Sequence, residues 1–107
     1  KDLAAAKTPV IVFNHQLLDG GGNYYVDNAA AVRSILEDSE KVIAVFQGHQ
    51  HKGNHSIING IHYYTLKAMC DGPYPDNNAF AVVEINQDRI NITGYAEVED
   101  RNLITKL

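Results

Sequence analysis

The sequence contains little cysteine and proline, no tryptophan and no long apolar stretch. Its 107 residues include one cysteine and three prolines. A single cysteine cannot form an internal disulfide, which excludes a disulfide-stapled scaffold and leaves both reducing and oxidising compartments open. No run approaches the roughly 18 apolar residues of a membrane span, and the N-terminus lacks the pattern of a signal peptide. We therefore expect a soluble chain without a membrane partner.

A surplus of basic residues is also missing. The chain has 9 lysines and arginines against 13 aspartates and glutamates, and its net charge of −4 is spread along the sequence. Binding to nucleic acid requires a basic stripe that follows the phosphates, so nucleic acid is excluded as a principal partner. The length and the hydrophobic fraction of 45% suit one globular domain or part of one.

The first half of the chain has the pattern of a strand, a helix and a second strand. Residues 9–13 and 42–46 are short apolar runs rich in β-branched side chains, which favours buried strands. Between them, Asp27 is the candidate N-cap of a helix that ends near Asp38 and carries its apolar residues on one face. Because both runs are apolar throughout, we expect two parallel strands in a sheet that is covered on both faces.

The second half has the pattern of antiparallel hairpins. Asn59-Gly60 is typical of a two-residue type I′ turn. A second hairpin with a longer loop follows residues 71–78, a segment rich in turn-forming residues. The predicted strands of the two hairpins are residues 56–58, 61–68, 79–85 and 90–96. The predicted fold is therefore α/β, with two parallel strands and a helix in one layer followed by antiparallel hairpins of a second sheet.

Three of the five histidines directly follow the two apolar runs. His15 follows the first, and Gly48-His49-Gln50-His51 follows the second. Ligands of open α/β sheets bind beyond the carboxyl ends of the strands, so we expect these histidines to meet. In extended backbone, His49 and His51 would point the same way with Cα atoms about 6.6 Å apart, which suits two metals about 3.5 to 4 Å apart. A His-x-His pair alone is more often a surface turn, but the added His15 favours a metal site with these three ligands.

These residues resemble a known family. The order of an apolar strand, Asn14-His15, an amphipathic helix, a second apolar strand and Gly48-His-Gln-His-Lys-Gly53 resembles the second half of calcineurin-like metallophosphoesterases. The continuation through residues 59–66 and Ala79-Phe80 is most similar to the branch that hydrolyses ADP-ribose and CDP-alcohols. The resemblance extends from residue 9 to about residue 94.

The resemblance implies a fold, a metal centre and a reaction. Whole members of the family are four-layer α/β/β/α sandwiches, so residues 1–107 would be the C-terminal portion of such a domain. His15 and His49 would bind one divalent ion and His51 the other, with manganese, iron or zinc as the metals. The implied reaction is in-line attack of hydroxide on phosphorus in a phosphoester or phosphoanhydride. Nucleotide-linked diphosphates are the implied substrates.

The earlier motifs of the family are absent. Asp-x-His, Gly-Asp-x-x-Asp and Gly-Asn-His-Asp/Glu occur nowhere in the sequence. Carboxylates provide much of the charge that holds two cations together, so we expect the chain alone to be inactive and assign it no catalytic residue. Residues 1–7 resemble the last turns of a helix that starts upstream, and removal of a tag or leader would explain the missing methionine equally well. We expect a missing N-terminal half, or a homodimer, to cover the exposed apolar faces. The alternative is a non-catalytic metal-binding or assembly module.

Three further residues are candidates for substrate contact. Asn14 precedes the first candidate ligand, and His55 follows the His-x-His pair closely enough to touch substrate or metal. Tyr74 could stack on a substrate ring. The alternatives are a solvated loop histidine and a partly buried tyrosine whose hydroxyl reaches the surface.

The other residues with chemically active side chains have structural interpretations. Cys70 lacks the arginine six residues further on that a thiol phosphatase needs, so we predict a small buried hydrophobe. Asp19, Asp71 and Asp76 are predicted turn formers. His62 lies within a strand pattern and is predicted to be a core or surface histidine.

Overall fold

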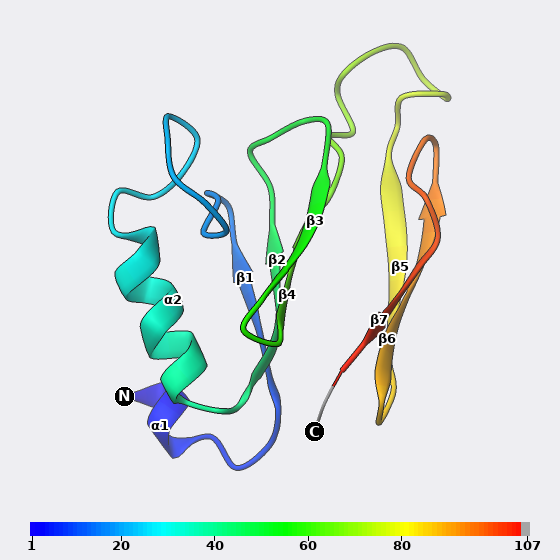
Figure 1. The fold of residues 1–107 in the computed structure, drawn as a ribbon. Helices are drawn as coiled ribbons and strands as arrows, with labels where there is room; N and C mark the ends of the chain where they lie inside the picture. Colours follow the sequence, from blue (N-terminus) through cyan, green and yellow to red (C-terminus); the bar gives the residue numbers. More distant parts are fainter. Residues whose placement is uncertain (106–107) are drawn as a thin grey trace.

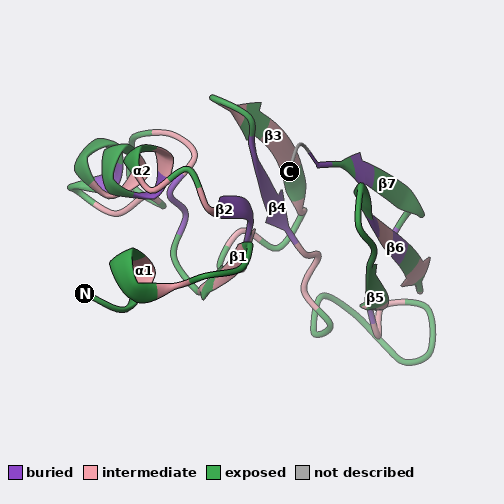
Figure 2. Ribbon diagram, turned by 90° about the horizontal axis from the view of Figure 1, so that it is seen from below, coloured by how far each residue is buried: buried purple, intermediate pink, exposed green. Residues whose placement is uncertain are grey.

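The computed structural model describes residues 1–105, which form three layers (Figure 1). The helices cover one face of a four-stranded sheet, and a three-stranded sheet packs against its other face (Figure 2). The elements in chain order are α1 (Asp2–Ala5), β1 (Val10–Asn14), α2 (Ala29–Asp38), β2 (Val42–Gln47), β3 (Asn54–Ile58), β4 (Ile61–Thr65), β5 (Phe80–Ile85), β6 (Arg89–Tyr95) and β7 (Arg101–Ile104).

The first sheet combines parallel and antiparallel pairing. Its strand order is β1-β2-β4-β3, with β2 parallel to both β1 and β4, and β3 antiparallel to β4. The sequence prediction placed the β3–β4 hairpin in the second sheet, which is wrong. Strand β4 lies beside β2 because it has apolar partners on both faces: Ile61 and Tyr63 pack under the helices, and Tyr64 packs against the second sheet.

The turn between β3 and β4 has the predicted type I′ character. Its central residues, Asn59 and Gly60, have φ angles of 49° and 81°, and positive φ at both positions is the mark of this turn. The second hairpin, β5 and β6, is also confirmed. Strand β7 was not predicted and pairs antiparallel with β6. It gives almost no pattern in the sequence, because only Leu103 of its four residues is buried.

The first sheet separates two apolar clusters. The cluster under the helices contains Leu18, Ala29, Leu36, Val42, Val45, Ile61 and Tyr63. The cluster between the sheets contains Ile43, Ala44, Tyr64, Ile90, Ile92 and Leu103. Strand β2 contributes to both, which explains its uninterrupted apolar sequence and confirms that it is covered on both faces.

The edge strands β1 and β5 expose apolar side chains. Phe13 of β1 is 79% exposed, and Val82 and Ile85 of β5 are 48% and 61% exposed. Each of these strands lies at the edge of its sheet. The expectation that this chain exposes apolar surface and free strand edges is therefore confirmed, while homodimerisation stays a prediction.

Helix α2 starts one residue later than predicted. Its N-cap is Asn28 rather than Asp27, because the Asn28 carbonyl accepts the first helical hydrogen bond, from the Val32 N–H at 3.1 Å. The helix then ends at Asp38, as predicted. Within residues 1–105, no helix has the length and apolar character needed to cross a membrane.

Candidate metal centre

The carboxyl ends of β1 and β2 bring two of the predicted ligands together. The parallel register pairs Asn14 with Gln47, so His15 and Gly48 leave the sheet side by side. The Gly48 N–H donates a hydrogen bond to the His15 carbonyl at 3.0 Å, which continues the strand pairing by one more residue. His15, and Gly48 directly before His49, are therefore held side by side by a backbone hydrogen bond and by the register of the sheet.

The imidazoles of His15 and His49 lie in contact. Their ring centroids are 5.4 Å apart, and the planes are nearly perpendicular at 87°. Gly48 leaves room for this approach, because a Cβ atom at this position would make a tight contact of 3.2 Å with His15 Nδ1. The sequence-based prediction of an extended backbone at His49 and His51 is wrong. His49 has a φ of 64°, and the Gln50 N–H donates to the Gly48 carbonyl at 2.7 Å, so the chain turns sharply at the site.

His51 lines the same cavity as the other two histidines. This histidine cavity has a volume of about 450 Å³, and its walls include His15, Gly48, His49, His51, Met69 and Cys70. The structure therefore brings all three predicted metal ligands to one cavity. His51 also has a partner that the sequence did not predict: its Nδ1 atom lies 2.6 Å from Asp71 Oδ1. Asp71 is thus more than a turn former.

A buried network holds the loop after His15 in place. Gln47, which is only 5% exposed, accepts a hydrogen bond from the Leu18 N–H at 2.7 Å. Its amide nitrogen donates to Asp19 and to Thr65, each at 3.1 Å. Asp19 also accepts a hydrogen bond from Ser56 at 2.7 Å. These bonds join the loop to β2, β3 and β4, so Asp19 has a structural role. Sequence reasoning missed Gln47, whose position at the end of an apolar strand was its signal.

The predicted substrate residues are not gathered at the cavity. Asn14 donates a side-chain hydrogen bond to the Gln16 carbonyl and lines a neighbouring apolar groove with Phe13. Tyr74 is 81% exposed on the loop after β4. Tyr24 instead approaches the site, with its ring centroid 5.6 Å from that of His49. Asn14 and Tyr74 as substrate residues therefore stay predictions.

His55 and His62 form a separate pair between the two sheets. Their rings stack with centroids 5.3 Å apart, and His55 Nε2 lies 3.0 Å from His62 Nδ1. The His62 Nε2 atom donates to the Ile104 carbonyl at 2.7 Å, which requires His62 Nδ1 to accept from His55. Burial, and then the charges of His62 and Arg101, lower the pKa of His55. Within residues 1–105 this pair does not line the histidine cavity, and contact of His55 with substrate or metal stays a prediction.

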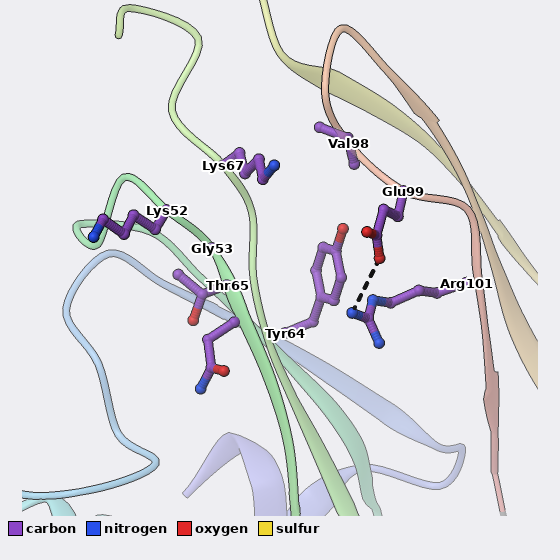
Figure 3. A pocket seen from close by; sticks show the side chains of 9 residues that line it. Lys52, Gly53, Tyr64, Thr65, Lys67, Val98, Glu99 and Arg101 are labelled. Atoms are coloured by element: carbon purple, nitrogen blue, oxygen red, sulfur yellow. Dashed lines mark ion pairs between the residues drawn. The ribbon is translucent and has the colours of Figure 1, made fainter.

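A small polar cleft also lies between the sheets (Figure 3). It has a volume of about 240 Å³, and Tyr64, Lys67, Glu99 and Arg101 are among its lining residues. Arg101 Nη2 lies 3.6 Å from Glu99 Oε2. Burial raises the pKa of Tyr64, an effect that Arg101 opposes and Glu99 reinforces. The cleft is lined by none of the three predicted metal ligands, so it is a separate feature of the described residues.

The donor atoms of the histidine cavity fit part of a metal centre. Three imidazoles suit a divalent transition metal. A centre with two cations also needs carboxylates, which neutralise charge and can bridge the ions. Among residues 1–105, the walls of this cavity contain no aspartate or glutamate. The three histidines therefore stay predicted ligands, at a cavity whose described walls offer no carboxylate.

The fold is that of part of a dimetal phosphatase. No protein-family model matches the sequence. The crystal structure of a dimetal phosphatase from Danio rerio superposes with a TM-score of 0.80 at 24% sequence identity, over 92% of this chain and 32% of that protein. A Vps29 single mutant from Entamoeba histolytica gives a TM-score of 0.50 at 22% identity, over 86% of this chain and 52% of that protein. The predicted fold class is thereby confirmed.

Curated relatives carry the name manganese-dependent ADP-ribose/CDP-alcohol diphosphatase. The protein with this name from Oryza sativa subsp. japonica is 31% identical over 107 residues, covering 96% of this chain and 33% of that protein. Its counterpart from Xenopus laevis is 31% identical over 77 residues, covering 71% of this chain and 21% of that protein. The chain thus spans a third or less of these relatives. The resemblance predicted from the sequence is confirmed: the chain is related to part of these metallophosphoesterases.

Proposed function

We propose that this chain is the C-terminal, histidine-bearing portion of a metal-dependent hydrolase of phosphoester or phosphoanhydride bonds. The observation that carries the proposal is the convergence of His15, His49 and His51 on one cavity beyond the parallel strands β1 and β2. The named relatives support the specific substrates, nucleotide-linked diphosphates such as ADP-ribose and CDP-alcohols, and support manganese as the metal.

The resemblance to metallophosphoesterases implies a role for each of the three histidines. His15 and His49 would hold one divalent ion, and His51 would hold the other. When bound, two such ions neutralise phosphoryl oxygens and lower the pKa of a water molecule. Gly48 keeps the His15 and His49 rings close, since any side chain there would push against His15. Asp71 fixes the orientation and tautomer of His51, as carboxylates commonly do for metal-binding histidines.

We further propose that the chain is inactive without the rest of its domain. The walls of the histidine cavity, within the described residues, have no carboxylate to hold a pair of cations. The chain also spans only 33% of the rice relative, so the carboxylate ligands would come from the other two thirds. The exposed edges of β1 and β5 offer the surface against which that part would pack.

A chimera tests this proposal. In the rice relative, the third that this chain matches is replaced by this chain, and ADP-ribose hydrolysis is measured with manganese. We expect manganese-dependent turnover by the chimera and none by this chain alone. A folded chimera without turnover would contradict the hydrolase function, and turnover by the chain alone that depends on His49 would contradict its inactivity.

A non-catalytic metal-binding or assembly module is the second candidate. Two observations favour it: the histidine cavity has no carboxylate among the described residues, and the edge strands expose apolar side chains such as Phe13. The chimera separates the two candidates. An assembly module would fold and bind metal in that context without supporting hydrolysis, whereas the proposed hydrolase requires turnover.

A further inference from the structure

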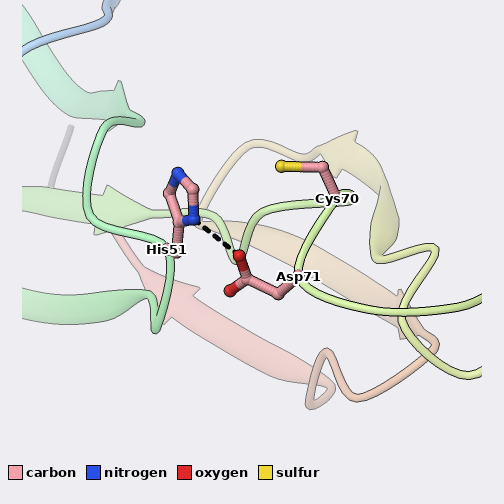
Figure 4. A group of neighbouring side chains, drawn as sticks. All are labelled: His51, Cys70 and Asp71. Atoms are coloured by element: carbon pink, nitrogen blue, oxygen red, sulfur yellow. Dashed lines mark hydrogen bonds and ion pairs between the residues drawn. The ribbon is translucent and has the colours of Figure 1, made fainter.

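The loop after β4 brings a thiol and a carboxylate to His51. Ligand atoms of His51, Cys70 and Asp71 all lie within 4.8 Å of one another, and the sulfur of Cys70 is drawn on the His51 side of the loop (Figure 4). Cys70 is exposed, so the prediction of a small buried hydrophobe is wrong. Cys70 also lines the histidine cavity. The three side chains thus supply nitrogen, sulfur and oxygen donors at one accessible place.

The spacing of these donors is close to that of a tetrahedral site. Zinc binds imidazole nitrogen and carboxylate oxygen at about 2.1 Å and thiolate sulfur at about 2.3 Å, so its ligand atoms lie about 3.4 to 3.6 Å apart. To reach this spacing, the His51 nitrogen and the Asp71 oxygen would move apart from their separation of 2.6 Å. The Cys70 sulfur lies within 4.8 Å of both atoms and would approach them by about 1 Å at most. All three side chains are exposed, which leaves room for the rotamer changes that this adjustment needs.

The chemistry of the donors selects a thiophilic ion. Thiolate is a soft ligand that favours zinc and disfavours manganese, and the same nitrogen and oxygen donors bind zinc more tightly than manganese. Binding would release the thiol proton of Cys70 to solvent, because the thiolate is the ligand. A water molecule would complete the four-coordinate shell, as in open zinc sites.

We propose that His51, Cys70 and Asp71 form a second metal site, which takes zinc or a similar thiophilic divalent ion and competes for His51 with the manganese centre. The competition rests on the proposed function and follows from the histidine tautomer. When Asp71 accepts a hydrogen bond from Nδ1, the lone pair of His51 is on Nε2. When zinc binds Nδ1, the proton is on Nε2, and this atom can no longer serve as a ligand. One neutral imidazole cannot supply both centres.

A cobalt titration of the intact chain tests the site without reference to activity. Cobalt(II) replaces zinc in such sites, and a bound thiolate produces a ligand-to-metal charge-transfer absorption in the near ultraviolet. We expect this band at one ion per chain in the wild-type protein and its loss in Cys70→Ser and His51→Ala. The matched control is His15→Ala, which removes a histidine of the same cavity and should retain the band. Cobalt binding without the band would overturn the proposal.

The competition is tested in the rice chimera with manganese present. Added zinc should inhibit hydrolysis, and Cys70→Ser should raise the zinc concentration for half inhibition at least tenfold. Equal zinc sensitivity of the two proteins would overturn the competition even if the cobalt band were present. If the chimera has no turnover at all, the hydrolase function fails, while the cobalt titration still decides whether the thiolate site exists.

Discussion

Two histidine pairs in this chain have nearly equal spacing and different surroundings. The His15–His49 centroids are 5.4 Å apart, and those of His55 and His62 are 5.3 Å apart. Between the sheets, His55 Nε2 donates to His62 Nδ1 and His62 Nε2 donates to the Ile104 carbonyl, so both ring nitrogens of His62 are engaged. At the carboxyl ends of β1 and β2, the His15 and His49 rings meet edge to face at a cavity.

The difference shows what separates a structural histidine from a candidate ligand. The lone pair of His62 accepts the His55 N–H, so His62 cannot bind a metal without breaking that bond. Proximity of two histidines is therefore a weak signal by itself. A stronger signal for a ligand is a histidine that lies beyond the ends of parallel strands and lines a cavity. At His15 and His49, a neighbouring glycine also leaves room for the two rings to approach each other.

The largest expected effect is a loss of turnover when a predicted metal ligand at the histidine cavity is removed. We predict that His49→Ala in the rice chimera lowers manganese-supported ADP-ribose turnover by more than about 100-fold, because even groups that only orient metal ligands are worth about 10- to 100-fold. Steady-state kinetics at saturating manganese measures this effect. A loss below tenfold would remove His49 from the metal centre.

The next effect concerns the pair between the sheets. His62 is 4% exposed and bonds to the Ile104 carbonyl at 2.7 Å. We predict that His62→Ala lowers the free energy of unfolding by about 2 to 4 kcal/mol, because it leaves a cavity and an unpaired carbonyl. Urea unfolding of the chain measures this loss. For comparison, His55→Ala should cost about 1 kcal/mol, since its ring is only half-buried. Equal losses would contradict the structural role of His62.

A smaller effect is expected from a single methyl group at the metal centre. A Cβ atom at Gly48 would lie 3.2 Å from His15 Nδ1. We predict that Gly48→Ala displaces the His15 ring and weakens manganese binding about tenfold. The matched control is Gly21→Ala, because a Cβ atom there meets nothing within 4 Å. Isothermal titration with manganese compares the two, and equal affinities would show that Gly48 does not position His15.

The smallest effect is a dependence of stability on pH. The pKa of His55 in the folded chain lies below its ordinary value of 6.5. As the pH falls below 6.5, the unfolded chain binds a proton first, so stability is complete above this pH and decreases below it. Urea unfolding between pH 8 and pH 5 should show this decrease, with a flatter profile in His55→Gln. An unchanged slope in the variant would assign the acid sensitivity to other groups.

Much of the backbone was predictable because local patterns agreed with the packing. The apolar runs of β1 and β2, the amphipathic α2 and the Asn59-Gly60 turn each have a distinct pattern, and all were found in place. Strand β7 was missed because three of its four residues face solvent. The sheet assignment of β3 and β4 was wrong because two-sided burial of β4 depends on neighbours that are distant in sequence.

The sequence was enough to predict that three histidines meet at one cavity, but not what surrounds them. The positions of His15, His49 and His51 beyond the strands were enough to expect one cavity. The Asp71 contact and the exposed thiol of Cys70 depend on the path of a long loop, which turn chemistry does not determine. The left-handed backbone at His49 was also missed, because such a conformation is uncommon outside glycine and asparagine.

A manganese titration of the intact chain, followed by electron paramagnetic resonance of the free ion, tests the central claim most directly. The claim predicts that wild-type chain binds manganese, that the double variant His15→Ala/His49→Ala binds at least tenfold more weakly, and that the matched double variant His55→Ala/His62→Gln retains wild-type affinity while folded. Equal weakening in both double variants, or none in the first, would contradict a metal centre at the carboxyl ends of β1 and β2.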